Sequence, residues 1–194
     1  ENMSGFVSGG KFANRVPAKY LAENFALSVS GGAYTVVGSE NPEAKLTADG
    51  VGYTFATLED AISAAASGDT ITLLGDVTVD STIDVKKAID LDLGGFTVTS
   101  TIEEGETESK PVFRFSAGDD VTIGNGTIAA KGTALEFVGT SMMGAATYTL
   151  ASDLTVTSEA SAIYAYGGLE LVSSATVESV GAAILTHGSE RGTT

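Results

Sequence analysis

Clustered carboxylates are the first residues of this 194-residue chain that suggest chemistry. The segment "EEGETE" at residues 103–108 contains four glutamates: Glu103, Glu104, Glu106 and Glu108. Calcium is a hard cation that takes about six to eight oxygen ligands, so an acidic loop of this kind is a calcium candidate. An isolated acidic loop is also an ordinary solvated surface loop. We therefore keep calcium as a hypothesis at these glutamates and expect no other cofactor.

A second acidic pair, Asp119 and Asp120, lies in "SAGDDVTIG" at residues 116–124. Paired carboxylates are what glycosidic bond hydrolysis requires. The motif Gly-Asp-Asp resembles that of polygalacturonase-type hydrolases, but the Asn-Thr-Asp and Arg-x-Lys motifs of that family are missing. Asp and Gly are also the usual residues of turns. We therefore prefer a turn here, with Asp119 and Asp120 as secondary hydrolase-like candidates, and we predict that the chain is not an enzyme.

Two tyrosines in "AIYAYGG" are candidates for sugar contact. Tyr164 and Tyr166 are two residues apart, so on a strand they share one face, while Ile163 takes the opposite face. A later segment has Ile184 at the equivalent isoleucine position, which favours isoleucine inside and tyrosine outside. Exposed tyrosine rings present an apolar surface with a polar tip, which suits stacking on sugar rings.

The elements that must position these residues are short repeated strands. Residues 154–168 match residues 175–189 at an offset of 21, residues 126–139 fit the same frame at an offset of 28, and residues 92–98 match residues 122–128 at an offset of 30. Repeats of about 20–30 residues with short strands are typical of β-solenoids, in which each coil stacks on the next with its apolar side chains inside. The sequence therefore predicts an all-β fold.

One helix is expected immediately before the first of these strands. Thr57 and Asp60 have the spacing of a capping box, and Gly68 follows as a stop signal. One apolar stripe is formed by Leu58, Ala61, Ile62 and Ala65. Because the open end of a solenoid exposes core and unpaired strand edges, we predict a capping helix at about residues 57–67 that serves as a lid.

Composition excludes several classes of partner. The formal net charge is −15 and only 10 residues are Lys or Arg, so a basic surface for nucleic acid is not expected. No apolar run approaches the roughly 20 residues of a membrane-spanning helix, so no membrane insertion is expected. The chain has 43% hydrophobic residues and no Cys, which permits a core without disulfides.

The segment from about residue 53 to the end resembles a known family. The parts that carry the resemblance are the helix, "SGDTITLL", "LDLGGFTVT" and "VTIGNGTI". They are similar to the right-handed parallel β-helix, pectate-lyase-like, of large cell-surface or secreted proteins of Gram-positive bacteria. The resemblance implies a right-handed parallel β-helix and an extracellular or cell-surface location in bacteria.

The predicted organisation has three parts. Residues 1–38 resemble the tail that closes a preceding solenoid, residues 39–52 are expected to be a linker, and residues 53–194 a β-helix whose C-terminus stops within the solenoid. The main functional hypothesis is a non-catalytic structural or adhesive module that binds host or environmental glycans or surface proteins. The alternatives are a glycan-binding or glycan-degrading β-helix, and a subunit that assembles head to tail with itself through the solenoid ends.

Overall fold

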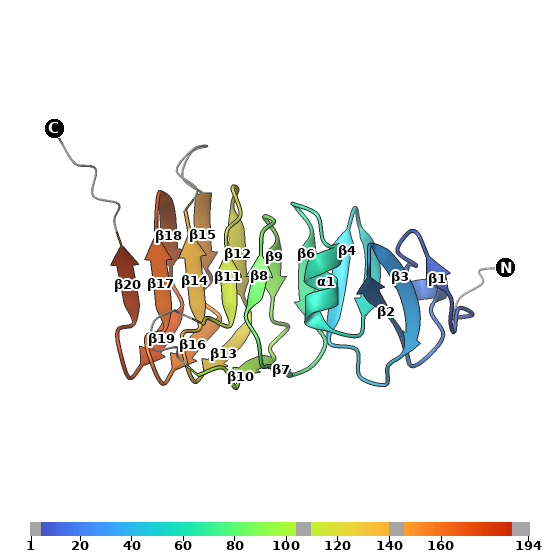
Figure 1. Ribbon diagram of the computed structural model, residues 1–194, viewed down its shortest axis with the longest axis horizontal. Coiled ribbons are helices and arrows are strands. Elements are labelled where there is room, and N and C mark those ends of the chain that lie inside the picture. The colour runs from blue at the N-terminus through green and yellow to red at the C-terminus, as the bar shows by residue number, and fades with distance from the viewer. Residues whose placement is uncertain (1–4, 104–109, 140–145, 188–194) are drawn as a thin grey trace.

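The protein is an all-β parallel solenoid, or β-helix, with one short α-helix. The computed structural model describes residues 5–103, 110–139 and 146–187. Figure 1 shows the coils stacked along the long axis, with α1 between the solenoid and the N-terminal strands.

Within the described residues, five coils contribute three strands each. The first coil is formed by β6 (Thr70–Leu73), β7 (Val77–Val79) and β8 (Ile83–Val85). The other coils are formed by β9 (Asp90–Asp92), β10 (Thr97–Ser100) and β11 (Phe113–Phe115); β12 (Val121–Gly124), β13 (Gly126–Ala130) and β14 (Leu135–Val138); β15 (Ala146–Leu150), β16 (Leu154–Ser158) and β17 (Ile163–Tyr166); and β18 (Leu169–Ser173), β19 (Thr176–Ser179) and β20 (Ile184–His187).

Equivalent strands of successive coils pair in parallel and form three faces. We call them the first face (β6-β9-β12-β15-β18), the second face (β7-β10-β13-β16-β19) and the third face (β8-β11-β14-β17-β20). The repeat offsets of 21 and 28 are confirmed by the pairs Thr155↔Thr176 and Thr127↔Thr155. The offset of 30 holds where Thr97 pairs with Thr127, but Asp92 pairs with Gly124 at an offset of 32. Turns of unequal length account for the change.

The core is a continuous stack of inward-facing side chains. Strands such as β15, β16 and β17 alternate between buried and half-buried residues, as strands with one apolar face do. At its centre, the ring of Phe137 lies 5.4 Å from that of Phe115 and 4.7 Å from that of Tyr148. The hydroxyl of Tyr148 donates to the backbone oxygen of Ala117 at 2.9 Å, so its polar atom is satisfied inside the core.

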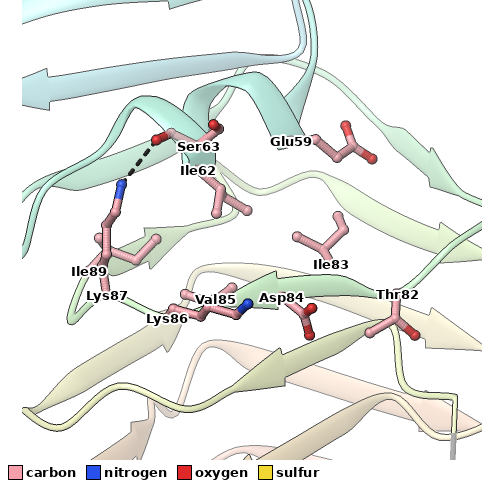
Figure 2. Close-up of a pocket in the computed structure, with 10 residues that line it drawn as sticks. All are labelled: Glu59, Ile62, Ser63, Thr82, Ile83, Asp84, Val85, Lys86, Lys87 and Ile89. Carbon is pink, nitrogen blue, oxygen red and sulfur yellow. Dashed lines mark hydrogen bonds between the residues drawn. The ribbon is translucent and has the colours of Figure 1, made fainter. Parts of the chain in front are cut away.

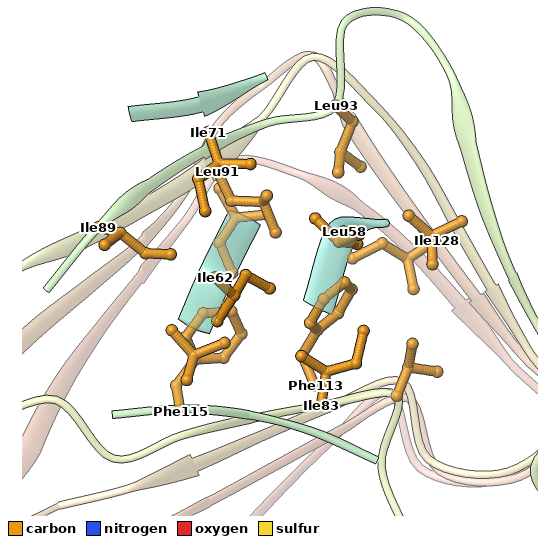
Figure 3. Packing of buried hydrophobic residues seen from close by; sticks show 14 of the residues in the cluster. Leu58, Ile62, Ile71, Ile83, Ile89, Leu91, Leu93, Phe113, Phe115 and Ile128 are labelled. Carbon is orange, nitrogen blue, oxygen red and sulfur yellow. The ribbon is translucent and has the colours of Figure 1, made fainter. Parts of the chain in front are cut away.

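The capping helix is present as α1 (Leu58–Ala64). Thr57 is its N-cap, and the Thr57 side chain accepts a hydrogen bond from the Asp60 amide at 3.2 Å. The predicted stripe is buried, and Figure 3 shows Leu58 and Ile62 among the core side chains of the coils. The helix ends three residues earlier than residue 67, because Ala65 already has extended backbone angles.

The N-terminal strands extend the first face. They are β1 (Lys11–Phe12), β2 (Phe25–Ser30), β3 (Ala33–Gly38), β4 (Ala44–Ala48) and β5 (Val51–Phe55), with a 3-10 helix η1 (Ala18–Tyr20) after β1. These strands and the first face form one ten-stranded sheet, in the order β1-β3-β2-β5-β4-β6 and onward. The tail at residues 1–38 is therefore paired within its own chain over its described part.

The structure differs from the predicted linker at residues 39–52. This segment contains β4, which pairs antiparallel with both β5 and β6. Ala44, Leu46 and Ala48 point into the core and are buried. Asp49 and Gly50, both with positive φ, form the turn to β5, and an Asp-Gly turn between alternating segments is a hairpin signal that the sequence does contain.

Candidate functional site

The outward row of the third face brings together residues from four coils. Asp84 on β8, Arg114 on β11, Glu136 on β14 and Tyr164 on β17 occupy successive register positions. Parallel strands lie about 4.7–4.9 Å apart, so each of these side chains can reach its neighbour in the next coil.

Three of the side chains on this face form a connected cluster, the Arg114–Glu136–Tyr166 cluster. Nε of Arg114 donates to Oε2 of Glu136 at 2.8 Å, and the hydroxyl of Tyr166 donates to Oε1 of the same carboxylate at 2.5 Å. Nη1 of Arg114 also lies 3.7 Å from Oδ1 of Asp84. Both oxygens of Glu136 are therefore hydrogen-bonded.

The cluster has unusual electrostatics for an outward-facing group. The residue Glu136 is only 4% exposed, although its strand position points away from the core. Burial, together with the hydrogen bond to Glu136 and its charge, raises the pKa of Tyr166 to about 12. Burial lowers the pKa of Arg114, but the bond to Glu136 and the nearby carboxylates outweigh it and leave that pKa raised. At neutral pH the tyrosine is protonated and the arginine is cationic.

The predicted orientation of the tyrosines is confirmed. Ile163 and Ala165 are buried, while Tyr164 and Tyr166 are half-buried on the outer side. The Tyr166 hydroxyl is occupied by Glu136, which leaves the Tyr164 ring as the better candidate for stacking on a sugar.

Sequence reasoning missed Arg114 and Glu136. The signal was present, since "FRF" and "LEF" each place one charged residue between two large apolar ones, and the two motifs are 22 residues apart. A charged residue between two inward-facing positions must point outward. The sequence pattern does not show the strand register that places Arg114 opposite Glu136.

Asp119 and Asp120 lie at the turn before β12. With Asp90 they line a shallow hollow of 540 Å³. Oδ1 of Asp120 accepts a hydrogen bond from the Thr147 amide of the next coil at 2.9 Å, and Asp119 is exposed. The turn interpretation therefore accounts for Asp120 directly.

Other turn aspartates have the same role as Asp120. Asp76 accepts from the Thr97 amide and Asp153 accepts from the Asn125 amide, both at 2.8 Å. Each bond joins one coil to its neighbour. Part of the large negative charge thus serves to satisfy backbone amides at the turns, where strand pairing does not.

The calcium candidates are only partly described. Glu103 is exposed, and Glu104, Glu106 and Glu108 lie outside the described residues. Among the residues that the structure describes, no group of three or more His, Cys, Asp or Glu side chains is placed to hold a metal ion.

A groove of 370 Å³ separates α1 from β8 (Figure 2). Ile62 from the helix and Ile83 and Val85 from the strand contribute its apolar lining. β8 is the end strand of the third face, and a free strand edge needs protection. Nζ of Lys87 donates to the backbone oxygens of Ser63, at 3.0 Å, and Ala65, so a cation holds the C-terminal end of α1 beside this edge.

No family model, curated protein or solved structure matches this chain. Within the described parts of the chain, no helix is long and apolar enough to cross a membrane. The site is therefore interpreted from its geometry alone.

Proposed function

We propose that this chain is a non-catalytic structural and adhesive module of an extracellular bacterial surface protein, of the pectate-lyase-like β-helix type found in large Gram-positive surface proteins. The observation that carries the proposal is one uninterrupted core from Leu58 in α1 to Ile163 in β17, with bonds between coils on its outside. A solenoid of this kind is a stiff rod, because each coil is held by both of its neighbours. Stiff rods suit the display of a binding surface away from a cell.

The test of the non-catalytic role is an assay for depolymerisation. The protein is incubated with polygalacturonate and other acidic glycans, with and without calcium, and reducing ends are measured. We expect no turnover. Turnover that disappears in Asp119→Ala and Asp120→Ala would overturn the proposal and establish a polysaccharide-degrading enzyme.

A second candidate function is glycan binding at the third face. It is favoured by Tyr164, whose half-exposed ring lies next to Glu136 in register. On a glycan array, binding that is lost in Tyr164→Ala and retained in Tyr164→Phe would support it, because phenylalanine keeps the stacking surface. If Tyr164→Ala and Tyr164→Phe both bind the glycan as tightly as the unmodified protein, the glycan does not stack on Tyr164.

Self-assembly through the solenoid ends is a third candidate. On the last described coil, Ile184 is 43% exposed and Leu185 37% exposed, and β20 is the end strand of its face. Exposed apolar strand edges recruit other strands. Light scattering across a concentration series would detect a larger species, and Ile184→Lys should abolish it. A monomer at every concentration would rule out self-assembly through the solenoid ends.

A further inference from the structure

A polar pocket of 380 Å³, which is open to solvent and which we call the cavity, lies between the loop that follows β1, the strands β3 and β5, and the end of α1. Its lining includes Asn14, Arg15, Tyr34 and Tyr53. The volume is within the range of about 300–1,000 Å³ that small-molecule sites occupy. It is separate from the Arg114–Glu136–Tyr166 cluster, with which it shares no residue.

Arg15 lies at this cavity, and not all of its N–H donors have a hydrogen-bond acceptor in the described part of the chain. Its guanidinium carbon lies 4.6 Å from the centroid of the Tyr53 ring, a cation–π contact that fixes the side chain. Nη1 of Arg15 is 3.6 Å from Oδ2 of Asp69, which is beyond hydrogen-bond distance. The same Asp69 oxygen already accepts from the Ala66 amide at 2.8 Å.

Nη1 of Arg15 is consequently a buried donor that has no hydrogen-bond partner among the described residues. Buried polar groups almost always have a partner, and one that lacks it calls for an explanation, such as an ordered water or a bound ion. A guanidinium carries five N–H donors in a fixed fork, so the contact with Asp69 leaves donors for a further acceptor.

The segment that supplies Asn14, Arg15 and Tyr34 to the cavity has no net charge of its own. Residues 1–48 contain four basic and four acidic residues. Residues 49–194 contain six basic and 21 acidic residues and therefore carry the whole net charge of −15. At physiological salt, charges interact over only about 8 Å, so the carboxylate of Asp69, 3.6 Å from Arg15, competes with a bound anion for the guanidinium.

We propose that this cavity binds a sugar residue that carries a carboxylate. Arg15 pairs with the carboxylate, because its planar fork matches carboxylate geometry. The amide of Asn14 and the hydroxyl of Tyr34 provide donors and acceptors for sugar hydroxyls. Both a uronic acid and a sialic acid have this chemistry. The site goes beyond the proposed structural role and stands on different residues from the Tyr164 candidate.

The test is calorimetric titration of the whole chain with four probes: galacturonate, N-acetylneuraminate, galactose and acetate. We expect one of the two sugar acids to bind more tightly than galactose and than acetate. Arg15→Lys keeps the charge but loses the fork and should weaken that binding by about ten-fold or more. Asn14→Ala, at an exposed loop position, should weaken it several-fold, and Lys19→Gln is the control.

Lys19 is a matched control because its Nζ also lies over a tyrosine ring, that of Tyr20 at 4.8 Å, and does not line the cavity. Binding should survive in Lys19→Gln. If Arg15→Lys fails to fold, as judged by thermal unfolding, Asn14→Ala still decides the question.

Several results would overturn the proposal. One is the absence of binding by both sugar acids at millimolar concentration. Another is acetate binding as tightly as the sugar acids, which would reduce the cavity to an anion site. A third is sugar-acid binding that survives Asn14→Ala and is lost in Tyr164→Ala, which would assign it to the third face.

Discussion

The lid role of α1 is tested most directly by Ile62→Asp. The Ile62 residue is 8% exposed and packs against the core of the first coil, with the groove beside β8 on its other side. Removing a buried isoleucine side chain costs about 2–5 kcal/mol by itself, and burying a carboxylate adds to that cost. We therefore expect a loss of at least about 3 kcal/mol in the free energy of unfolding at pH 7.

For a chain of this size, about 1 kcal/mol corresponds to roughly 2–4 °C in the midpoint of thermal unfolding. The expected decrease is therefore about 6–12 °C, measured by circular dichroism. The loss should be smaller near pH 4, where a buried carboxyl is protonated and no charge is buried.

Ser63→Asp is the matched control, because it introduces the same charge into the same helix at an exposed position. An acidic residue near the end of a helix costs only about 0.3–1 kcal/mol. Equal midpoints for Ile62→Asp and Ser63→Asp would refute the reasoning, since they would mean that α1 does not cover the core in solution.

Three further predictions concern the coils and the cap. Gly139→Ala should lower the midpoint of thermal unfolding by several degrees, because a Cβ there would lie 2.6 Å from the backbone nitrogen of Gly168, whereas Gly168→Ala has open space and should be neutral. The pKa of Tyr166 is raised to about 12 in the folded state, so its contribution to stability should be complete below about pH 10 and be lost as the pH rises toward 12. Ultraviolet titration should show one tyrosine that ionises at a higher pH than an ordinary tyrosine. Glu136→Gln should lower the pKa of Tyr166. The carboxylate of Glu43 accepts a hydrogen bond from the Leu58 amide, the first of α1, at 2.9 Å. Glu43→Ala should therefore lower the free energy of unfolding by about 1 kcal/mol in chemical denaturation, and Glu43→Gln, which keeps an acceptor oxygen, should lower it less. Equal losses in the two variants would exclude this capping role.

Burial of the carboxylate of Glu43 raises its pKa, with a smaller contribution from Glu59, while the bond from the Leu58 amide opposes the shift. A raised folded-state pKa means that the contribution of this group to stability is greatest at low pH and declines as the pH rises through the folded pKa.

The sequence by itself determined which side chains face inward and where the helix begins. Alternation with a period of two is a local property, so Ile163 inside and Tyr164 outside could be inferred from a few residues. The N-cap at Thr57 and the buried stripe of α1 are equally local, because they depend on residues within two helical turns.

The tertiary structure alone decided which outward side chains meet. Arg114 reaches Glu136 because two coils happen to differ by 22 residues at this face, and that offset depends on the lengths of the turns between them. The same holds for the pairing of β4 with β6: the Asp-Gly turn indicates the hairpin with β5, but no local pattern indicates β6. Register joins residues far apart in the chain, and its energy comes from contacts that exist only once the coils have stacked.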